Sequence, residues 1–306
     1  MENELPRRLF AAGNEPEVDK INNSCRMSVL TKIKAAMPEE YNELKNDSVF
    51  ANIVALHENN LGYSARLIHS MMCRQLITEK KYEIWCVFGG RPLRFSLQEF
   101  YAVTGLKYKD EDGIRDSEEW KDDNGFWSKL LKRKDKISIK MLLDNHLPRV
   151  KVWNNIDKIR FVSVLSMGLD AFELLADSII EVQGSLKKKG SYVLNGFSYA
   201  FQIWVMEAIP KIGSILGKKL NDEYAEGPRC SNWTGAAIAF YDDIICLEDN
   251  FQMTDVIYPY ISFSGSLDLC ESSDFAWPKE TRDATVDYLK AVIKSGNGMF
   301  GAVWKQ

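Results

Sequence analysis

The chain has 306 residues, of which 45% are hydrophobic and 27% charged, a composition typical of a globular protein rather than a disordered one. With 39 basic and 43 acidic residues, its net charge of −4 gives no general attraction to nucleic acid, so such a contact would need a local basic patch. No apolar run reaches the ~18 residues that a membrane-spanning helix needs, so we expect no membrane association.

The first residues, MENELPRRLF, do not have the form of a signal peptide, which predicts a protein that stays inside the cell. In that setting cysteines remain reduced, and none of those in this chain forms a C-x-x-C pair. We therefore expect mostly buried thiols and no disulfide framework at the six positions Cys25, Cys73, Cys86, Cys230, Cys246 and Cys270.

Three helices are predicted between residues 38 and 76, joined by short polar turns. Pro38 suits a first helical position and is followed by two acids, which are favourable in a first turn. Ser48 precedes the apolar stretch VFANIVAL, and Ser64 precedes SARLIHSMMCRQLI, whose apolar residues have helical spacing. Both serines are expected to act as N-terminal caps.

A β-hairpin is predicted over residues 82–95, where KYEIWCVF and LRF flank Gly89-Gly90-Arg91-Pro92. The aromatic and β-branched residues favour strands, and the glycines permit positive φ in the turn. A phosphate-binding loop would place its glycines directly at a helix N-terminus, whereas here Arg91 to Phe95 intervene. We interpret the glycine pair as a turn and not as a nucleotide site.

The helix that follows has strong boundary signals. Ser96 and Glu99 have the S-x-x-E spacing of a capping box, and Phe95 and Phe100 have the spacing of a hydrophobic staple. Gly105 is placed for a left-handed C-terminal cap.

Residues 109–125 contain eight acids and three bases and are expected to form a solvated loop. The next segment, 129–140, is rich in Lys and Arg and has two readings, a nuclear-import or phosphate-contacting patch and a solvated approach to a helix. The basic candidates are Lys129, Lys132, Arg133, Lys134 and Lys136. Three aromatic residues beside them have no obvious core partner and are candidate partner contacts: Trp120, Phe126 and Trp127.

The rest of the chain predicts further helices over 156–175, over 196–209 and near 280–295. The stretch GFSYAFQIWVMEAI is apolar nearly all round, which indicates a central buried helix, and Pro210 should stop or kink it. Short runs such as AAIAFY are prone to form strands, and Asp242-Asp243 is expected in a surface turn.

Residues that commonly carry chemistry are few. His57, His69 and His146 belong to no zinc-binding pattern, and the two first are expected to pack or to form hydrogen bonds. The segment GSILGKK has the wrong spacing for a P-loop. We expect no metal, no cofactor, no small-molecule ligand and no catalytic residue.

The run from Lys80 to Leu106, KKYEIWCVFGGRPLRFSLQEFYAVTGL, with LPRRLFAAGNEP before it, resembles a plant domain of unknown function that is abundant in crucifers. In transposon-derived proteins that domain often precedes a SUMO-protease-like cysteine peptidase domain. The run is more distantly similar to the plant mobile domain. The positions that carry the resemblance, expected to be structural, are Trp85, Gly89, Gly90, Pro92, Arg94, Phe95, Ser96, Glu99 and Gly105.

The resemblance implies a plant nuclear protein of transposon-derived origin, but it supplies no reaction. No cysteine here is followed by glycine, as the peptidase's would be, so we expect either a stand-alone descendant or a piece that ends before the peptidase.

We expect a mainly α (α+β) fold, a compact multi-helix domain with a small antiparallel hairpin or sheet. It is expected to be one domain over 1–306, or two lobes, 1–108 and 126–306, joined by the acidic loop. The favoured hypothesis is a non-enzymatic nuclear protein-interaction module, acting in a chromatin or silencing complex. The alternatives are a nucleic-acid-binding domain that uses 129–140, a non-catalytic piece of a SUMO-protease-like protein, and a residual thiol hydrolase, which needs a thiolate beside a base.

Overall fold

The architecture was analysed in a computed structural model of the chain. The residues it describes are 3–18, 20–23, 27–47, 50–106, 139–154, 157–158, 161, 171–186, 191–224, 226–270, 272–277, 280–295 and 304–305. Within these residues, no helix is both long enough and apolar enough to cross a membrane.

The described residues form mostly short helices. The α-helices are α1 (Ser28–Ala36), α2 (Pro38–Asn46), α3 (Ala51–Glu58), α4 (Ala65–Cys73), α5 (Leu97–Thr104), α7 (Ile139–Asn145), α9 (Ala171–Gln183), α10 (Ser198–Ala208), α11 (Pro210–Leu216), α12 (Tyr241–Asp249) and α13 (Ala284–Lys294). The 3-10 helices are η1 (Leu147–Val152), η2 (Arg229–Asn232) and η3 (Ser273–Phe275).

Strands are few and pair only in twos among the described residues. They are β1 (Asn3–Glu4), β2 (Lys20–Asn23), β3 (Ile84–Phe88), β4 (Arg91–Phe95), β5 (Ser191–Leu194), β6 (Lys218–Lys219), β7 (Trp233–Thr234) and β8 (Trp304–Lys305). The pairs β3–β4 and β6–β7 are antiparallel, whereas β1–β8 and β2–β5 are parallel. The predicted fold class, mainly helical with a small antiparallel hairpin, is confirmed.

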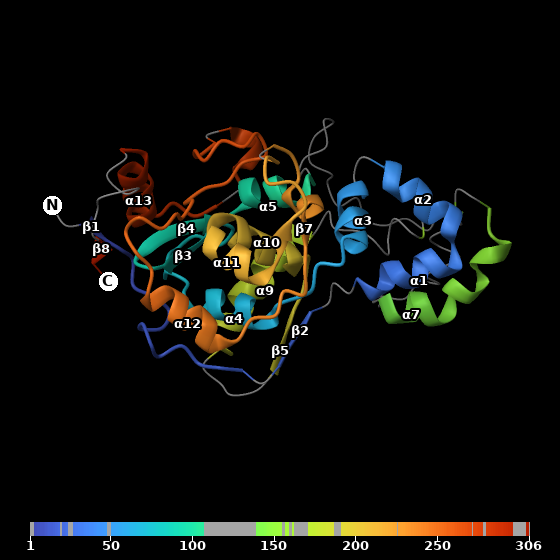
Figure 1. Cartoon of the computed structure of the whole chain (residues 1–306), viewed down its shortest axis with the longest axis horizontal. Coiled ribbons are helices and arrows are strands. Elements are labelled where there is room, and N and C mark those ends of the chain that lie inside the picture. Colours follow the sequence, from blue (N-terminus) through green and yellow to red (C-terminus); the bar gives the residue numbers. More distant parts are fainter. Residues whose placement is uncertain are drawn as a thin grey trace.

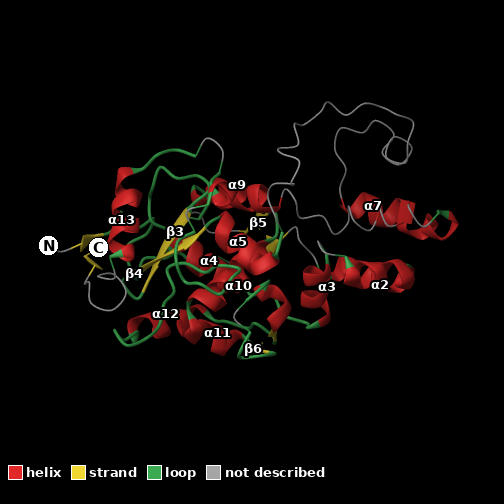
Figure 2. Ribbon diagram, turned by 90° about the horizontal axis from the view of Figure 1, so that it is seen from above, coloured by secondary structure: helices red, strands yellow, loops and turns green. Residues whose placement is uncertain are grey.

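Helix α10 lies at the centre of the main body, with α4, α5, α9, α11 and the β3–β4 hairpin around it (Figure 1). Every residue of α10 is buried, as its nearly all-apolar sequence predicts, and Pro210 ends it by starting α11. Helices α1, α2 and α7 gather at one end of the long axis, away from the hairpin, and Figure 2 shows the same separation from above.

The hairpin and the helix after it follow their local sequence signals. Ser96 and Glu99 form the predicted capping box, and Gly105 ends α5 with a φ of 74°. The rings of Phe95 and Phe100 both pack on Phe172, with centroid distances of 6.1 and 5.4 Å. The turn is shorter than predicted, because Arg91 and Pro92 already belong to β4 and Pro92 pairs with Val87.

Helix α12 corrects a prediction. The sequence around Asp242-Asp243 was expected to be a strand-prone run ending in a surface turn, but it forms a helix. Asp243 accepts a hydrogen bond from the Phe240 N–H at 3.2 Å, which is the contact of an N3 acid at a helix start. Only Ile244 of this helix is buried, so the sequence lacks the spaced apolar residues that predict an amphipathic helix.

Candidate functional site: a hollow beside helix α4

The glycine pair at the hairpin tip is a turn that the protein itself fills. Gly89 and Gly90 have φ of 54° and 72°, the left-handed region that glycine adopts without strain. The Gly89 N–H donates to Oε1 of Glu248 at 3.2 Å, and the same carboxylate pairs with buried Arg74 at 2.7 Å. Phe251 lies so close that a Cβ on Gly89 would be 2.6 Å from its ring.

The hairpin tip therefore does accept a carboxylate, but it is one from α12. This arrangement gives one backbone N–H of the turn an anionic acceptor from the protein itself. It also joins the hairpin to α4 and α12 through one buried ion pair.

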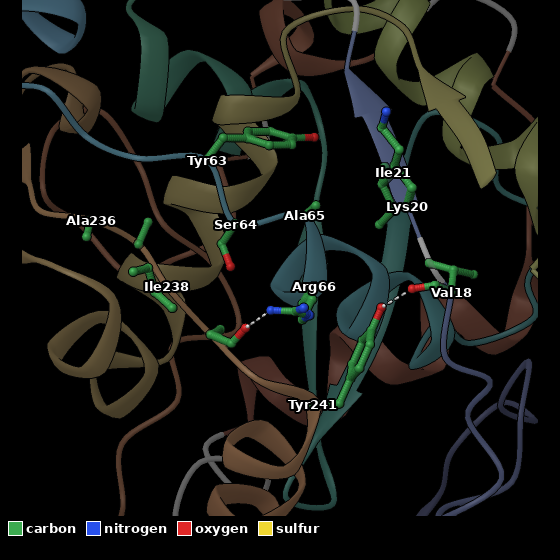
Figure 3. Close-up of a pocket in the computed structure, with 12 residues that line it drawn as sticks. Val18, Lys20, Ile21, Tyr63, Ser64, Ala65, Arg66, Ala236, Ile238 and Tyr241 are labelled. Carbon is green, nitrogen blue, oxygen red and sulfur yellow. Dashed lines mark hydrogen bonds between the residues drawn. The ribbon is translucent and has the colours of Figure 1, made fainter. Parts of the chain in front are cut away.

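A second place in the fold has the same chemistry and is not filled. It is a hollow of about 280 Å³ at the N-terminal end of α4, which we name the α4 hollow (Figure 3). Its walls come from three segments far apart in the sequence. They are Val18, Lys20 and Ile21 at β2; Tyr63, Ser64, Ala65 and Arg66 at the start of α4; and Ala236, Ala237, Ile238, Ala239 and Tyr241 before and in α12.

Gly62 brings two of these segments together. Its N–H donates to the Gly235 carbonyl at 2.8 Å, and a Cβ at this position would lie 2.0 Å from the Ala236 carbonyl oxygen. Since only glycine has no Cβ, this close approach requires it. The wall formed by 236–239 is thus fixed against the start of α4.

Ser64 occupies the N-cap position of α4, as predicted, but the prediction that its side chain caps the helix is wrong. Its hydroxyl makes no cap hydrogen bond. The residue is only 4% exposed, and its Oγ has no hydrogen-bond partner among the described residues. A buried hydroxyl without a partner is costly and uncommon in folded proteins.

The backbone explains the missing cap. The Ser64 N–H donates to Oε1 of buried Gln202 on α10 at 2.7 Å, and Nε2 of Gln202 donates to the Gly62 carbonyl at 2.9 Å. Held from behind in this way, Ser64 adopts φ −100° and ψ 86°, outside the extended conformation of an ordinary cap residue. In Figure 3 its hydroxyl points into the space between α4 and the 236–239 wall.

The charge of the α4 hollow is positive. Its lining contains Lys20 and Arg66 and no acidic residue. Arg66 makes one long hydrogen bond, 3.4 Å to the Ala239 carbonyl, and its guanidinium lies over the Phe240 ring at 5.3 Å. Neither cation forms an ion pair with a carboxylate in the part of the chain that the structure describes.

Behind the hollow, a buried cluster gives no support to thiol chemistry. Nε2 of His69 lies 2.6 Å from the Pro16 carbonyl, so it carries the proton and cannot accept one from Cys73, whose Sγ is 3.4 Å away. Nδ1 faces the Tyr192 hydroxyl at 2.8 Å. Burial lowers the pKa of His69 and raises the pKa of Cys73 to about 12. The neutral thiol and the neutral ring are therefore the stable forms.

The other described cysteines do not lie beside a base either. Burial raises the pKa of Cys86, and that of Cys230 to about 12. Cys246 and Cys270 are exposed, and all five are free thiols. His57 contacts the hydroxyls of Tyr41 at 2.8 Å and Thr31 at 3.0 Å, in a different part of the fold from His69. These contacts agree with the packing role expected for the two histidines.

The motif residues predicted to be structural lie in and around the hairpin and α5. Arg94 pairs with fully buried Glu99 at 2.9 Å, and Nε1 of Trp85 donates to Glu83 at 2.8 Å. The carboxylate of Glu99 also accepts from the backbone N–H and the hydroxyl of Ser96, at 2.9 and 2.7 Å. The hydrogen-bonding and charged groups of Arg94, Ser96 and Glu99 are therefore paired with one another.

The other predicted site residues lie outside the described residues. They are the aromatic candidates Trp120, Phe126 and Trp127 and the basic candidates Lys129, Lys132, Arg133, Lys134 and Lys136. Partner binding and nucleic-acid binding through them stay predictions. Local sequence patterns assign no role to Lys20 or Arg66 and only a capping role to Ser64, and the signal available for this place was the Gly62 that precedes a cap serine.

Comparison with protein families identifies one segment. Residues 72–169 match the model of a domain of unknown function (DUF1985). The match begins at the end of α4 and includes the hairpin and α5. No curated protein and no solved structure matches the chain.

Proposed function

We propose that this protein is a non-enzymatic interaction module that binds a protein partner through the surface around the α4 hollow. One observation carries the proposal, an irregular segment beside the hollow, with Ala237 at a φ of 51°, in which buried and exposed residues follow one another. Ala237 and Ala239 are 2% and 5% exposed, whereas Ile238 and Phe240 between them are 63% and 56% exposed. Large apolar side chains that gather on one exposed surface, unlike ones scattered singly, mark contact surfaces.

The end of helix α11 lies against this segment. The Ala237 N–H donates to the Leu216 carbonyl at 3.0 Å, and neighbouring Ile215 is 52% exposed. We name the three exposed residues Ile215, Ile238 and Phe240 the apolar rim. A partner that covers the rim buries the exposed half of three large hydrophobic side chains, each contributing on the order of 1 kcal/mol, about half the value for a complete transfer from water.

The cellular setting that we propose follows from the resemblance of Lys80–Leu106 to the crucifer domain. It is that of a plant nuclear protein of transposon-derived origin, acting in a chromatin or silencing complex. The basic segment 129–140 would serve as its nuclear-import signal.

A peptide-display selection on the purified full chain tests the function. Selected peptides should bind the protein, and Ile238→Asp with Phe240→Asp should weaken them at least tenfold, because the rim loses its apolar contacts. Leu174→Asp is the matched control, since Leu174 on α9 is 51% exposed and lies outside the rim. Peptides that bind the double variant as well as the parent would refute the proposal, as would a selection that yields none.

A further inference from the structure

Two places in this fold have backbone N–H groups available to a carboxylate, the Gly89 N–H at the hairpin tip and the first turn of α4. At the hairpin tip the site is occupied by Glu248, and at the α4 hollow no described side chain occupies it. We propose that the α4 hollow binds the carboxylate of an acidic side chain on the partner. This inference rests on the proposed function for its peptide context and adds the chemistry of one contact.

The donors are the first turn of α4 and the hydroxyl of its cap residue. The N–H groups of a first helical turn have no acceptor within the helix, and the helix dipole favours negative charge there. No acceptor for the N–H groups of Ala65, Arg66 and Leu67 is found among the described residues. Ser64 adds a hydroxyl. The residue is only 4% exposed, its Oγ has no hydrogen-bond partner among the described residues, and the hydroxyl points toward the α4 hollow (Figure 3).

The side chains around these donors select for charge. Lys20 and Arg66 border the hollow with no acidic residue in its lining, although the whole protein carries a net charge of −4. An incoming carboxylate therefore meets attraction from two cations and repulsion from no lining group. Because both cations reach solvent, they also guide an acidic segment toward the hollow in a salt-dependent manner.

The size and walls of the hollow indicate a single side chain on a peptide. About 280 Å³ is below the range usual for cofactors and drug-sized ligands. Ile21, Ile238 and the alanines make the remaining walls apolar, and the hollow opens beside the apolar rim. A phosphate carries nearly two charges and three acceptor oxygens, whereas the hollow has a single arginine and one lysine at its border, so we assign it the smaller, singly charged carboxylate. The expected ligand is thus an Asp or Glu next to apolar residues.

The test uses small probes, so it does not depend on finding the partner. N-acetyl-aspartate amide is titrated into the isotope-labelled full chain at constant ionic strength, and the amide signals of residues 65 and 66 are followed by NMR. We expect saturable shifts, and binding about tenfold weaker for N-acetyl-asparagine amide, which has the same shape without the charge. N-acetyl-phosphoserine amide is the third probe.

Protein variants complete the test. Ser64→Ala should weaken the aspartate probe about fivefold and Arg66→Gln about tenfold, while Arg282→Gln, an arginine with a 91% exposed side chain on another surface, should leave it unchanged. Equal binding of the two amide probes, no saturable shift, or tighter binding of phosphoserine would each overturn the carboxylate site. If these probes fail while selected peptides still need the rim, the proposed function stands without this inference.

Discussion

The N-cap serines of α4 and α5, Ser64 and Ser96, should respond differently to the same substitution. Ser96 accepts from the Gln98 N–H at 3.3 Å and donates to the buried Glu99 carboxylate at 2.7 Å. Ser96→Ala loses a cap contact, about 1 kcal/mol, and a hydrogen bond to a charged group, about 1.5–3 kcal/mol. The free energy of unfolding should therefore fall by roughly 3 kcal/mol.

Ser64→Ala should not lower the free energy of unfolding. Its hydroxyl is buried without a partner, so the folded protein already bears a desolvation cost of about 1–3 kcal/mol that alanine removes. The variant should be as stable as the parent or up to about 1 kcal/mol more stable. Urea unfolding followed by circular dichroism, with both variants measured under identical conditions, gives the comparison. A loss for Ser64→Ala as large as that for Ser96→Ala would refute the claim that this hydroxyl is unused in the fold.

Three further predictions concern the hairpin turn, pH and the thiols. Gly89→Ala should destabilise the protein by roughly 3 kcal/mol, through strain and its clash with Phe251, whereas Gly90→Ala, with no atom near its added Cβ, should cost about 1 kcal/mol. Unfolding free energy should decrease as pH falls below about 6.5, because burial lowers the pKa of His69 in the folded state and the unfolded chain then binds the proton more readily. Iodoacetamide should label Cys246 and Cys270 in the native protein and leave the three buried thiols until it is unfolded.

Each of these has a contrary result. Equal losses for the two glycine variants, measured by urea unfolding, would show that Phe251 does not pack on the turn as described. A pH profile of stability that is unchanged by His69→Gln between pH 7.5 and 5.5 would remove this histidine from the account. Native labelling of a buried thiol, located by peptide mass mapping, would contradict its raised pKa.

Local signals in the sequence predicted the hairpin and α5 well. Ser96, Glu99 and Gly105 act through hydrogen bonds and backbone angles within one helix, so their spacing is sufficient to place its ends. The burial of α10 could also be predicted, because apolar residues occur on all sides of the helix and no side is polar enough to face water.

The features that form the candidate site depend on contacts between distant segments. Ser64 fails to cap because Gln202, 138 residues away, holds its backbone, and no local pattern reports that bond. The β2–β5 pair joins Lys20 with Ser191 in a parallel register, which cannot be predicted from either segment alone. Helix α12 was missed because its outer face keeps apolar residues such as Ile245 exposed.

A crystal structure of the protein with its tightest selected peptide tests the central claim most directly. The account predicts a peptide carboxylate oxygen within hydrogen-bond distance of the Ser64 Oγ, apolar peptide side chains on Ile238 and Phe240, and Glu248 still bound to the Gly89 N–H. A peptide acid that has displaced Glu248 at the hairpin tip, with the α4 hollow empty, would contradict it.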